Sequence, residues 1–247
     1  LPENSQEAPF AEDFDYAILG PIDLGLGKFA EVAFFHRRSH TILITDTIVS
    51  VPSDPPAIAQ LDPYPLLYHA KDKASDIVAD TPANRLKGWQ RVTLFALYFS
   101  PSVLEVPTWG EVWRDAEKAP ERSRKAYFGF FPFQWQENWQ DSFNILRGNG
   151  RIFVAPILQT LILNRAPQET INWADKVAKW DFQWIIPCHF DAPIKAEPQQ
   201  FRQVFAFLEK QPVGGFVSNN SYPLPEDDFK LLRNIDAGLN KFGIVPP

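Results

Sequence analysis

Methionine is absent from this sequence of 247 residues, and cysteine occurs once, at Cys188. A single cysteine excludes an intramolecular disulfide, and its scarcity predicts a reducing compartment such as cytoplasm or stroma. The sequence opens with Leu1 and holds no methionine, so no translation start lies within it. We therefore expect a fragment or a processed form, whose upstream portion holds further structure.

Long basic runs and long apolar runs are also missing. Lysine and arginine never follow one another beyond a pair, and the net charge is −6, which excludes the electrostatic footprint of a nucleic-acid-binding protein. The longest apolar run, residues 152–163, is shorter than the roughly 20 residues that a bilayer-spanning helix needs. We expect no transmembrane segment, while peripheral membrane association stays open. With 45% hydrophobic residues, the chain can bury a core.

Strand and helix patterns alternate along the later part of the chain, which predicts an α/β fold. Residues 1–14 are acidic and lack any period, so we expect an extended strap, and the proline-rich residues 52–65 predict an irregular segment. Residues rich in β-branched and aromatic side chains predict strands at 16–22, 32–35, 42–51 and 183–187. Helical spacing and N-capping residues predict helices at 82–97, 108–118, 168–180, 198–210 and 226–239.

Two polar residues follow short apolar runs and are the leading site candidates. Asp46 follows one apolar run, and His189 follows Pro187 and Cys188 at the end of the run 183–187 far downstream. A carboxylate and an imidazole at the mouths of separate strands can share one metal ion or one substrate. Asp191 could orient the imidazole if the strand continued past His189. The structural alternatives are a turn acid that accepts backbone hydrogen bonds for Asp46 and a buried structural histidine for His189.

The other histidines and the cysteine carry weaker signals. His36 and His40 bracket a tight turn, where hydrogen bonding to turn groups is favoured over metal binding. His69 has no acidic or thiol partner at ligand spacing, so we assign it no role. Cys188 and His189 are adjacent in a strand pattern and point to opposite faces, which argues against an activated cysteine nucleophile.

Residues 127–139, YFGFFPFQWQENW, form an aromatic segment that contains no aliphatic side chain. Such a segment either fills the core of its own domain or forms a docking surface for a protein or an apolar cofactor. The side chains that would form the interaction surface are Phe128, Phe130, Phe131, Phe133, Trp135 and Trp139.

The motifs AEVAFFHRRSHTILITDTIVSVP, KGWQRVTLFALYF, RIFVAPILQTLILNRAPQE and WDFQWIIPCHFDAPI resemble a domain-of-unknown-function family of cyanobacterial and plastid proteins related to the metallo-β-lactamase fold. The resemblance extends from about residue 15 to residue 210. It implies an αββα sandwich of which this chain holds the C-terminal part, with a domain at 15–247 and a helical insertion at 53–150. It also implies a location in the cyanobacterial cytoplasm or the plastid stroma.

In that superfamily a strand ending in Asp supplies a metal-bridging carboxylate, and a late strand ending in His supplies a terminal ligand. Asp46 and His189 match these positions, which implies zinc, iron or manganese. The main signature, His-x-His-x-Asp-His, is absent, so we expect a degenerate member with weak or no hydrolase activity that binds little metal or none. The alternatives are an active metal-dependent hydrolase of an ester, thioester or amide, and a non-catalytic subunit of a larger, photosynthetic assembly. Half a sandwich leaves one sheet face uncovered, which implies packing against the missing upstream portion or another protein.

Overall fold

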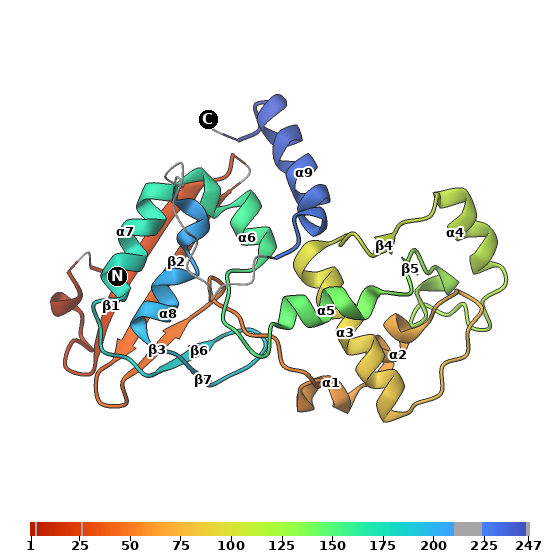
Figure 1. Cartoon of the computed structure of the whole chain (residues 1–247), viewed down its shortest axis with the longest axis horizontal. Helices are drawn as coiled ribbons and strands as arrows, with labels where there is room; N and C mark the ends of the chain where they lie inside the picture. Colours follow the sequence, from red (N-terminus) through yellow and green to blue (C-terminus); the bar gives the residue numbers. More distant parts are fainter. Residues whose placement is uncertain (3, 26, 210–223, 246–247) are drawn as a thin grey trace. The chain divides into compact units, whose positions relative to one another are not determined.

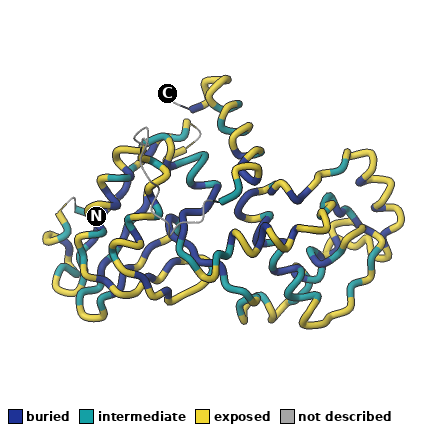
Figure 2. The backbone as a smooth tube through the Cα atoms, in the orientation of Figure 1, coloured by how far each residue is buried: buried dark blue, intermediate teal, exposed yellow. Residues whose placement is uncertain are grey.

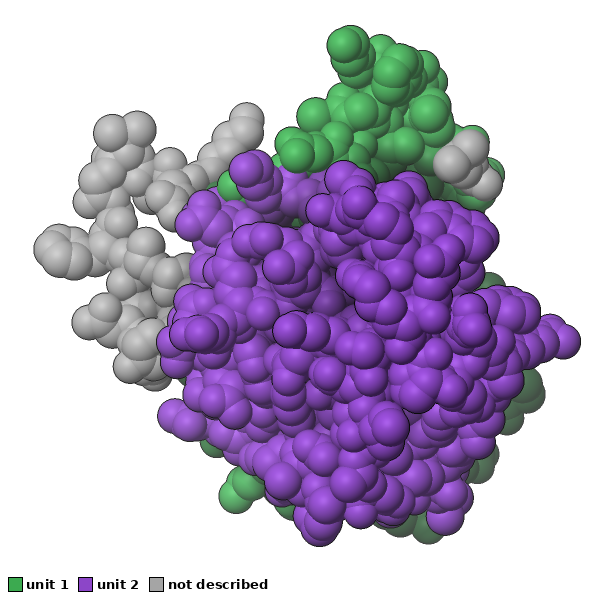
Figure 3. Space-filling view, turned by 90° about the vertical axis from the view of Figure 1, so that its right-hand side faces the viewer, with its two compact units in different colours: residues 1–51, 150–223, 232–247 green, residues 52–149, 224–231 purple. Residues whose placement is uncertain are grey.

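The computed structural model describes residues 1–2, 4–25, 27–209 and 224–245, and it divides into two compact units that are coloured separately in Figure 3. Each unit is built from more than one stretch of the chain. Unit 1 comprises Leu1–Val51, Gly150–Pro223 and Leu232–Pro247, and unit 2 comprises Pro52–Asn149 and Leu224–Leu231. The main segment of unit 2 therefore runs from residue 52 to residue 149, and its bounds differ by one residue at each end from those of the insertion predicted at 53–150.

Unit 1 contains a five-stranded mixed sheet with the order β1-β2-β3-β6-β7 (Figure 1). The strands are antiparallel except for β3 and β6, which pair in parallel with Ile44 opposite Pro187. The predicted strand regions are confirmed, although the segment 42–51 contributes only three residues, 42–44, to its strand. The bounds are Phe14–Asp23 for β1, Lys28–His36 for β2, Thr41–Ile44 for β3, Trp184–Pro187 for β6 and Ile194–Lys195 for β7.

Helices pack on one face of this sheet (Figure 1). The indole of Trp173 in α7 donates a hydrogen bond of 3.0 Å to the carbonyl of Ala17 in β1, and the ring of Trp180 stacks on Phe35 of β2. The strand residues on this face, Ala17, Ala33, Ile42 and Ile185, are fully buried (Figure 2). The helical elements of unit 1 are η1 (Ser5–Glu7), α6 (Pro156–Leu161), η3 (Leu163–Arg165), α7 (Pro167–Val177), α8 (Pro198–Gln203), η4 (Ala206–Leu208) and most of α9 (Lys230–Lys241).

The opposite face of the sheet is apolar yet largely accessible among the described residues. Its side chains from β1, β3 and β6 are 36% to 40% exposed at Ile18, Leu43, Trp184 and Ile186, and Val32 of β2 is half-buried among them. The N-terminal segment covers one end of this face, where the ring of Phe10 lies 6.1 Å from Tyr16 and 6.0 Å from Phe34. We call Ile18, Val32, Leu43, Trp184 and Ile186 the open face.

Unit 2 is mainly helical, and its longest helix follows the predicted capping. Thr81 caps α3 with a hydrogen bond from Asn84 N, and Thr108 with Glu111 forms the predicted capping box of α4. Gly88 of α3 lies against α2, because a Cβ atom there would fall 1.7 Å from the carbonyl oxygen of Leu66. The elements are α1 (Ala57–Leu61), α2 (Tyr64–Ala70), α3 (Pro82–Tyr98), β4 (Leu104–Glu105), α4 (Trp109–Ala116), η2 (Tyr127–Gly129), β5 (Gln134–Trp135), α5 (Trp139–Arg147) and η5 (Glu226–Phe229).

Three local predictions are wrong. Residues 1–14 are not extended: Asn4 caps the short helix η1, and turns lead from there to β1. Residues 52–65 are not irregular throughout, because Pro56 and Pro63 stand at N-cap positions, where proline starts a helix rather than breaking one. The dipeptide Gly20-Pro21 predicts a turn, but it lies inside β1 at a shift of register between Leu19 and Ile22. The glycines, asparagines and prolines of residues 212–226 also predict a loop, and this segment falls mostly outside the described residues.

Chain composition and hydropathy predicted no membrane span, and the helices of the described residues include none that is both long and apolar enough to cross a bilayer.

Candidate functional site

Asp46 and His189 lie together at one edge of the mixed sheet. The parallel strands β3 and β6 end opposite one another at Ile44 and Pro187, and each of the two polar residues follows two positions later. The amide of Cys188 donates to the carbonyl of Thr45 at 3.2 Å, which carries the pairing one step further. Nε2 of His189 is 2.9 Å from Oδ1 of Asp46. The sequence therefore identified two groups that meet in space.

A buried carboxylate beneath this edge fixes the loop that carries Asp46. Glu31 of β2 is 1% exposed, and its two oxygens accept hydrogen bonds from the backbone amides of Thr45, Asp46 and Thr47 at 3.1, 2.8 and 3.2 Å. The hydroxyls of Thr45 and Thr47 donate to the same carboxylate. A carboxylate with this many donors is satisfied although it is buried, so it holds the loop in one conformation.

The dyad itself is accessible, with side-chain exposure of 61% for His189 and 45% for Asp46. The next residue, Phe190, adopts a φ of +67°, which an aromatic residue rarely takes and which costs of order 1 kcal/mol or more. Strained backbone of this kind concentrates at sites where a neighbouring side chain must be held in place. The strain follows directly on the candidate histidine.

Asp191 does not take the predicted role. The strand ends at Pro187, and the left-handed turn at Phe190 redirects the chain. The amide of Asp191 donates to the carbonyl of Ser50 at 3.0 Å, and its exposed carboxylate has no bond to the imidazole. The imidazole pairs with Asp46 instead, because only the strand neighbour comes within reach.

The remaining histidines and the cysteine lie outside this dyad. Nδ1 of His36 is 2.7 Å from Oγ of Ser39, and Nδ1 of His40 is 3.2 Å from a carboxylate oxygen of Asp181, so both pair with groups near the turn. Cys188 is exposed. His69 lies on α2 rather than in a loop, and burial lowers its pKa to about 4, assisted by Arg91.

The aromatic segment divides between core and surface. Phe131 and Trp139 are buried inside unit 2 and cannot belong to a docking surface, because Phe131 packs against Tyr68 and Trp139 lies under the guanidinium of Arg91. Phe130, Phe133 and Trp135 are half-buried, and Phe128 is exposed at a φ of +58°. The reading of a core-filling segment therefore holds for part of it.

The dyad supplies two of the ligands that a zinc, iron or manganese ion would take. A tetrahedral ion with bonds of about 2 Å would set Oδ1 and Nε2 roughly 3.3 Å apart, so the pair would need to open by about 0.4 Å. The donor types and the exposure fit such an ion. No cluster of three or more His, Cys, Asp or Glu suited to a metal occurs within the described residues.

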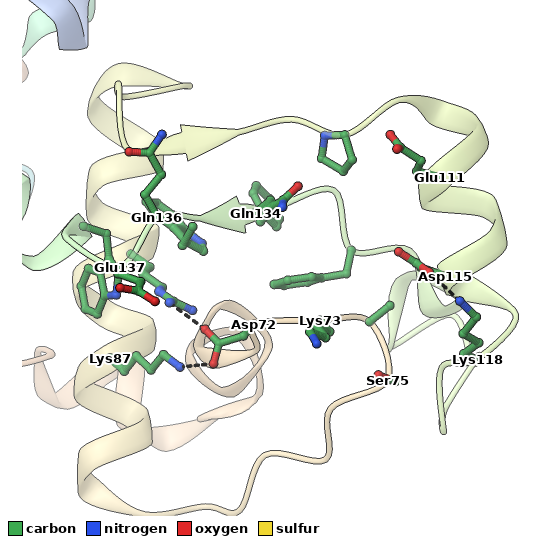
Figure 4. Close-up of a pocket in the computed structure, with 17 residues that line it drawn as sticks. Asp72, Lys73, Ser75, Lys87, Glu111, Asp115, Lys118, Gln134, Gln136 and Glu137 are labelled. Carbon is green, nitrogen blue, oxygen red and sulfur yellow. Dashed lines mark hydrogen bonds and ion pairs between the residues drawn. The ribbon is translucent and has the colours of Figure 1, made fainter.

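A second polar site lies within unit 2, where a cavity of about 860 Å³ opens between α3, α4 and the aromatic segment (Figure 4). At one side Asp72 binds Nζ of Lys87 at 2.7 Å and the guanidinium of Arg91 at 2.8 Å. Burial acts to raise the pKa of Asp72, but the hydrogen bonds from Lys87 and Arg91 outweigh it and lower that pKa. At the other side Asp115 pairs with Lys118 at 3.0 Å.

Sequence reasoning missed Glu31 and the cavity. A glutamate inside the apolar strand KFAEVAFFH was a usable signal, because a charge in a buried strand requires partners. The residues that line the cavity come from separate segments between 72 and 139, and no motif or spacing connects them.

The fold and site thus define a mixed α/β protein with an exposed carboxylate–imidazole pair at the ends of two parallel strands. The chain belongs to the family described as "Domain of unknown function (DUF4336)", which matches residues 1–207. No curated protein and no solved structure matches the chain.

Proposed function

We propose that this chain is a metallo-β-lactamase-like protein in which Asp46 and His189 hold one divalent metal ion weakly, with weak or no hydrolysis of an ester, thioester or amide. The observation that carries the proposal is the separation of 2.9 Å between Oδ1 of Asp46 and Nε2 of His189 at the ends of neighbouring parallel strands.

Two features of unit 1 support the fold part of this proposal. Helices cover one face of the mixed sheet, while the other face carries the apolar side chains of the open face. A sheet with one helical layer and one bare apolar face is what a single half of an αββα sandwich looks like, since the second sheet would pack there.

The chemistry of the pair supports the site part. Nε2 of His189 lies 2.9 Å from Oδ1 of Asp46, and these two groups would be the protein ligands of a divalent ion, which would compete with a proton on the imidazole. A bound ion would lower the pKa of a coordinated water and supply a nucleophile. The Glu31 carboxylate, out of reach behind the loop, holds the Asp46 loop before any ligand arrives.

Calorimetric titration of the chain with Zn²⁺ and with Mn²⁺ tests the proposal. We expect one binding event that Asp46→Asn or His189→Asn weakens at least tenfold, since each change removes one of two protein ligands. His40→Asn is the matched control, because His40 is also an exposed histidine beside a carboxylate, that of Asp181. Unchanged affinity in the Asp46 variant, or equal losses in all three variants, would refute the assignment.

Activity is measured separately with p-nitrophenyl acetate at saturating metal. The proposal expects a low rate at most, and any rate that is measured should disappear in both dyad variants. A rate that survives in Asp46→Asn would place the hydrolysis elsewhere in the molecule.

The second candidate is a non-catalytic subunit, and the open face is the observation that favours it. Its apolar side chains alternate along four strands, which suits packing against a second β-sheet of a partner protein about 10 Å away. In this second candidate function the docking surface is therefore the open face, whereas the sequence predicted a docking surface on the aromatic segment.

A further inference from the structure

The cavity of unit 2 has the dimensions of a small-molecule site. Its volume of about 860 Å³ lies in the range of roughly 300–1,000 Å³ that ligand pockets occupy. Its walls combine rings with charged groups. In Figure 4, Asp72, Lys87 and Glu137 lie on one side, Glu111, Asp115 and Lys118 on the other, and Lys73 and Gln134 between them.

The charged groups that line the cavity balance in number. Four cations face four anions, namely Lys73, Lys87, Arg91 and Lys118 against Asp72, Glu111, Asp115 and Glu137. A lining with no net charge disfavours a ligand that carries a large net charge of either sign. This excludes polyphosphates and polyamines as good occupants.

Most of these charges already have partners. Asp72 binds both Lys87 and Arg91, and Asp115 binds Lys118. The carboxylate of Glu111 accepts two hydrogen bonds from Thr108, through its amide and its hydroxyl, in the cap of α4. Within the described part of the chain, the ammonium group of Lys73 and the carboxylate of Glu137 have no such partner. Both residues are exposed, so one cation and one anion at the rim of the cavity are accessible to a ligand.

Rings supply the rest of the surface. Phe133 and Trp135 are half-buried and line the cavity, and Arg91 lies 5.4 Å from the ring of Trp135 and 4.8 Å from that of Trp139. Arg91 is 3% exposed, and its Nη1 donates to the carbonyl of Lys71 at 2.8 Å. The guanidinium therefore stabilises this wall of the cavity and does not contact a ligand. Half-buried aromatic faces favour a planar apolar group.

We propose that the cavity of unit 2 binds an aromatic zwitterion, a ring that carries both an ammonium and a carboxylate, with Lys73 pairing the carboxylate, Glu137 pairing the ammonium, and Phe133 and Trp135 contacting the ring. Free aromatic amino acids and short peptides with an aromatic end both have this chemistry. The site is independent of the Asp46–His189 dyad in residues and in ligand.

The test pairs protein variants with ligand analogues in calorimetric titrations of the full chain. L-Tryptophan carries both charges, L-tryptophanamide lacks the carboxylate, and N-acetyl-L-tryptophan lacks the ammonium. We expect Lys73→Ala to weaken L-tryptophan about tenfold and to leave the affinity for L-tryptophanamide unchanged, since that analogue has nothing to offer Lys73. Glu137→Gln should weaken L-tryptophan similarly and leave N-acetyl-L-tryptophan unchanged.

Matched controls are Lys71→Ala and Glu117→Gln, which alter an equal charge near the cavity at residues that do not line it; both should leave the affinity for L-tryptophan unchanged. Tighter binding of the dipeptide Ala-Trp than of L-tryptophan would assign the site to peptide ends, and the reverse order would assign it to free amino acids. No binding of L-tryptophan or of Ala-Trp to the unaltered chain would overturn the proposal. So would equal losses for L-tryptophan and L-tryptophanamide in Lys73→Ala.

Discussion

Each unit buries one charged side chain, and the two side chains differ in how fully their hydrogen-bonding groups are satisfied. In unit 1 the carboxylate of Glu31 is surrounded by backbone amides and hydroxyls, and the exposed dyad stands on the loop that it holds. In unit 2 the guanidinium of Arg91 is just as buried, yet its Nε has no hydrogen-bond partner in the described structure, and it relies on one carboxylate, one carbonyl and two indole rings.

The buried carboxylate of Glu31 therefore orders one loop, whereas the buried guanidinium of Arg91 holds together the segments that line the cavity of unit 2. The anion at Glu31 is neutralised by local dipoles of a single loop, so its loss would affect that loop first. The cation at Arg91 connects α3 to the loop after α2 and to the aromatic segment, so its loss would affect packing across unit 2. Glu31→Ala and Arg91→Lys each remove one side of this contrast, while His69 and Ile186 compare the two units at other sites.

Glu31→Ala is expected to have the largest effect. The substitution leaves the amides of Thr45, Asp46 and Thr47 without their acceptor, of which that of Thr47 is buried and the other two are part-buried, and we expect a loss of about 3–5 kcal/mol in the free energy of unfolding. Urea denaturation followed by circular dichroism measures it, with the exposed Glu12→Ala as a control that should change little. A loss below about 1 kcal/mol would show that water replaces the carboxylate.

Acid should weaken unit 2 through His69. Its folded pKa, about 4, lies below the ordinary 6.5, so the unfolded chain binds the proton more readily. Stability is complete above pH 6.5 and falls as the pH drops from 6.5 to 4, by up to about 3 kcal/mol. Denaturation at pH 7.5 and 4.5 measures the loss, and His69→Phe, which fills the same aromatic surroundings, should remove most of it. An unchanged pH dependence in this variant would assign the effect to other groups.

Arg91→Lys keeps the charge and removes the planar fork. A lysine cannot stack on Trp135 and Trp139 or reach Asp72 and the carbonyl of Lys71 together, so we expect a loss of about 2 kcal/mol. Arg85→Lys is the control, since Arg85 also bonds a carboxylate through two nitrogens but lies closer to solvent, where the change should cost under about 1 kcal/mol. Equal losses would mean that burial of Arg91 adds nothing.

The smallest change in stability is expected on the open face. Ile186→Lys places a charge on a side chain that is 40% exposed, so the free energy of unfolding should change by less than about 1 kcal/mol. Binding of an apolar dye and any self-association measured by light scattering should fall. The exposed Ile77→Lys in unit 2 is the control. Equal dye binding in both variants would show that the open face is covered in solution.

Much of the sheet could be predicted, because β-branched and aromatic residues mark β1, β2, β3 and β6, and the apolar run before Asp46 and that before His189 end where the strands end. The helices α3 and α4 could also be predicted, because the N-cap residues Thr81 and Thr108 mark their first turns in the local sequence. The prediction of an irregular segment at 52–65 was wrong around α1 and α2, because proline disrupts the interior of a helix but is favoured at its start.

The sites were predictable only where strand order brings the residues together. Asp46 and His189 follow neighbouring strands, so their convergence needed one correct guess about topology. Asp191 failed because a single left-handed residue, Phe190, turned the chain. The cavity depends on the packing of α2 against α3 and on where the aromatic segment returns, which no local pattern encodes.

The chain passes from unit 1 to unit 2 and back more than once, and this affects its synthesis. As the polypeptide leaves the ribosome, β3 must wait for β6, with all of residues 52–149 emerging between them. Unit 2 waits as well, since Asp228 accepts hydrogen bonds from the amide and hydroxyl of Ser102. The nascent chain therefore exposes the unpaired edge of β3 until residues 184–187 have emerged, and such an edge is a surface that chaperones bind.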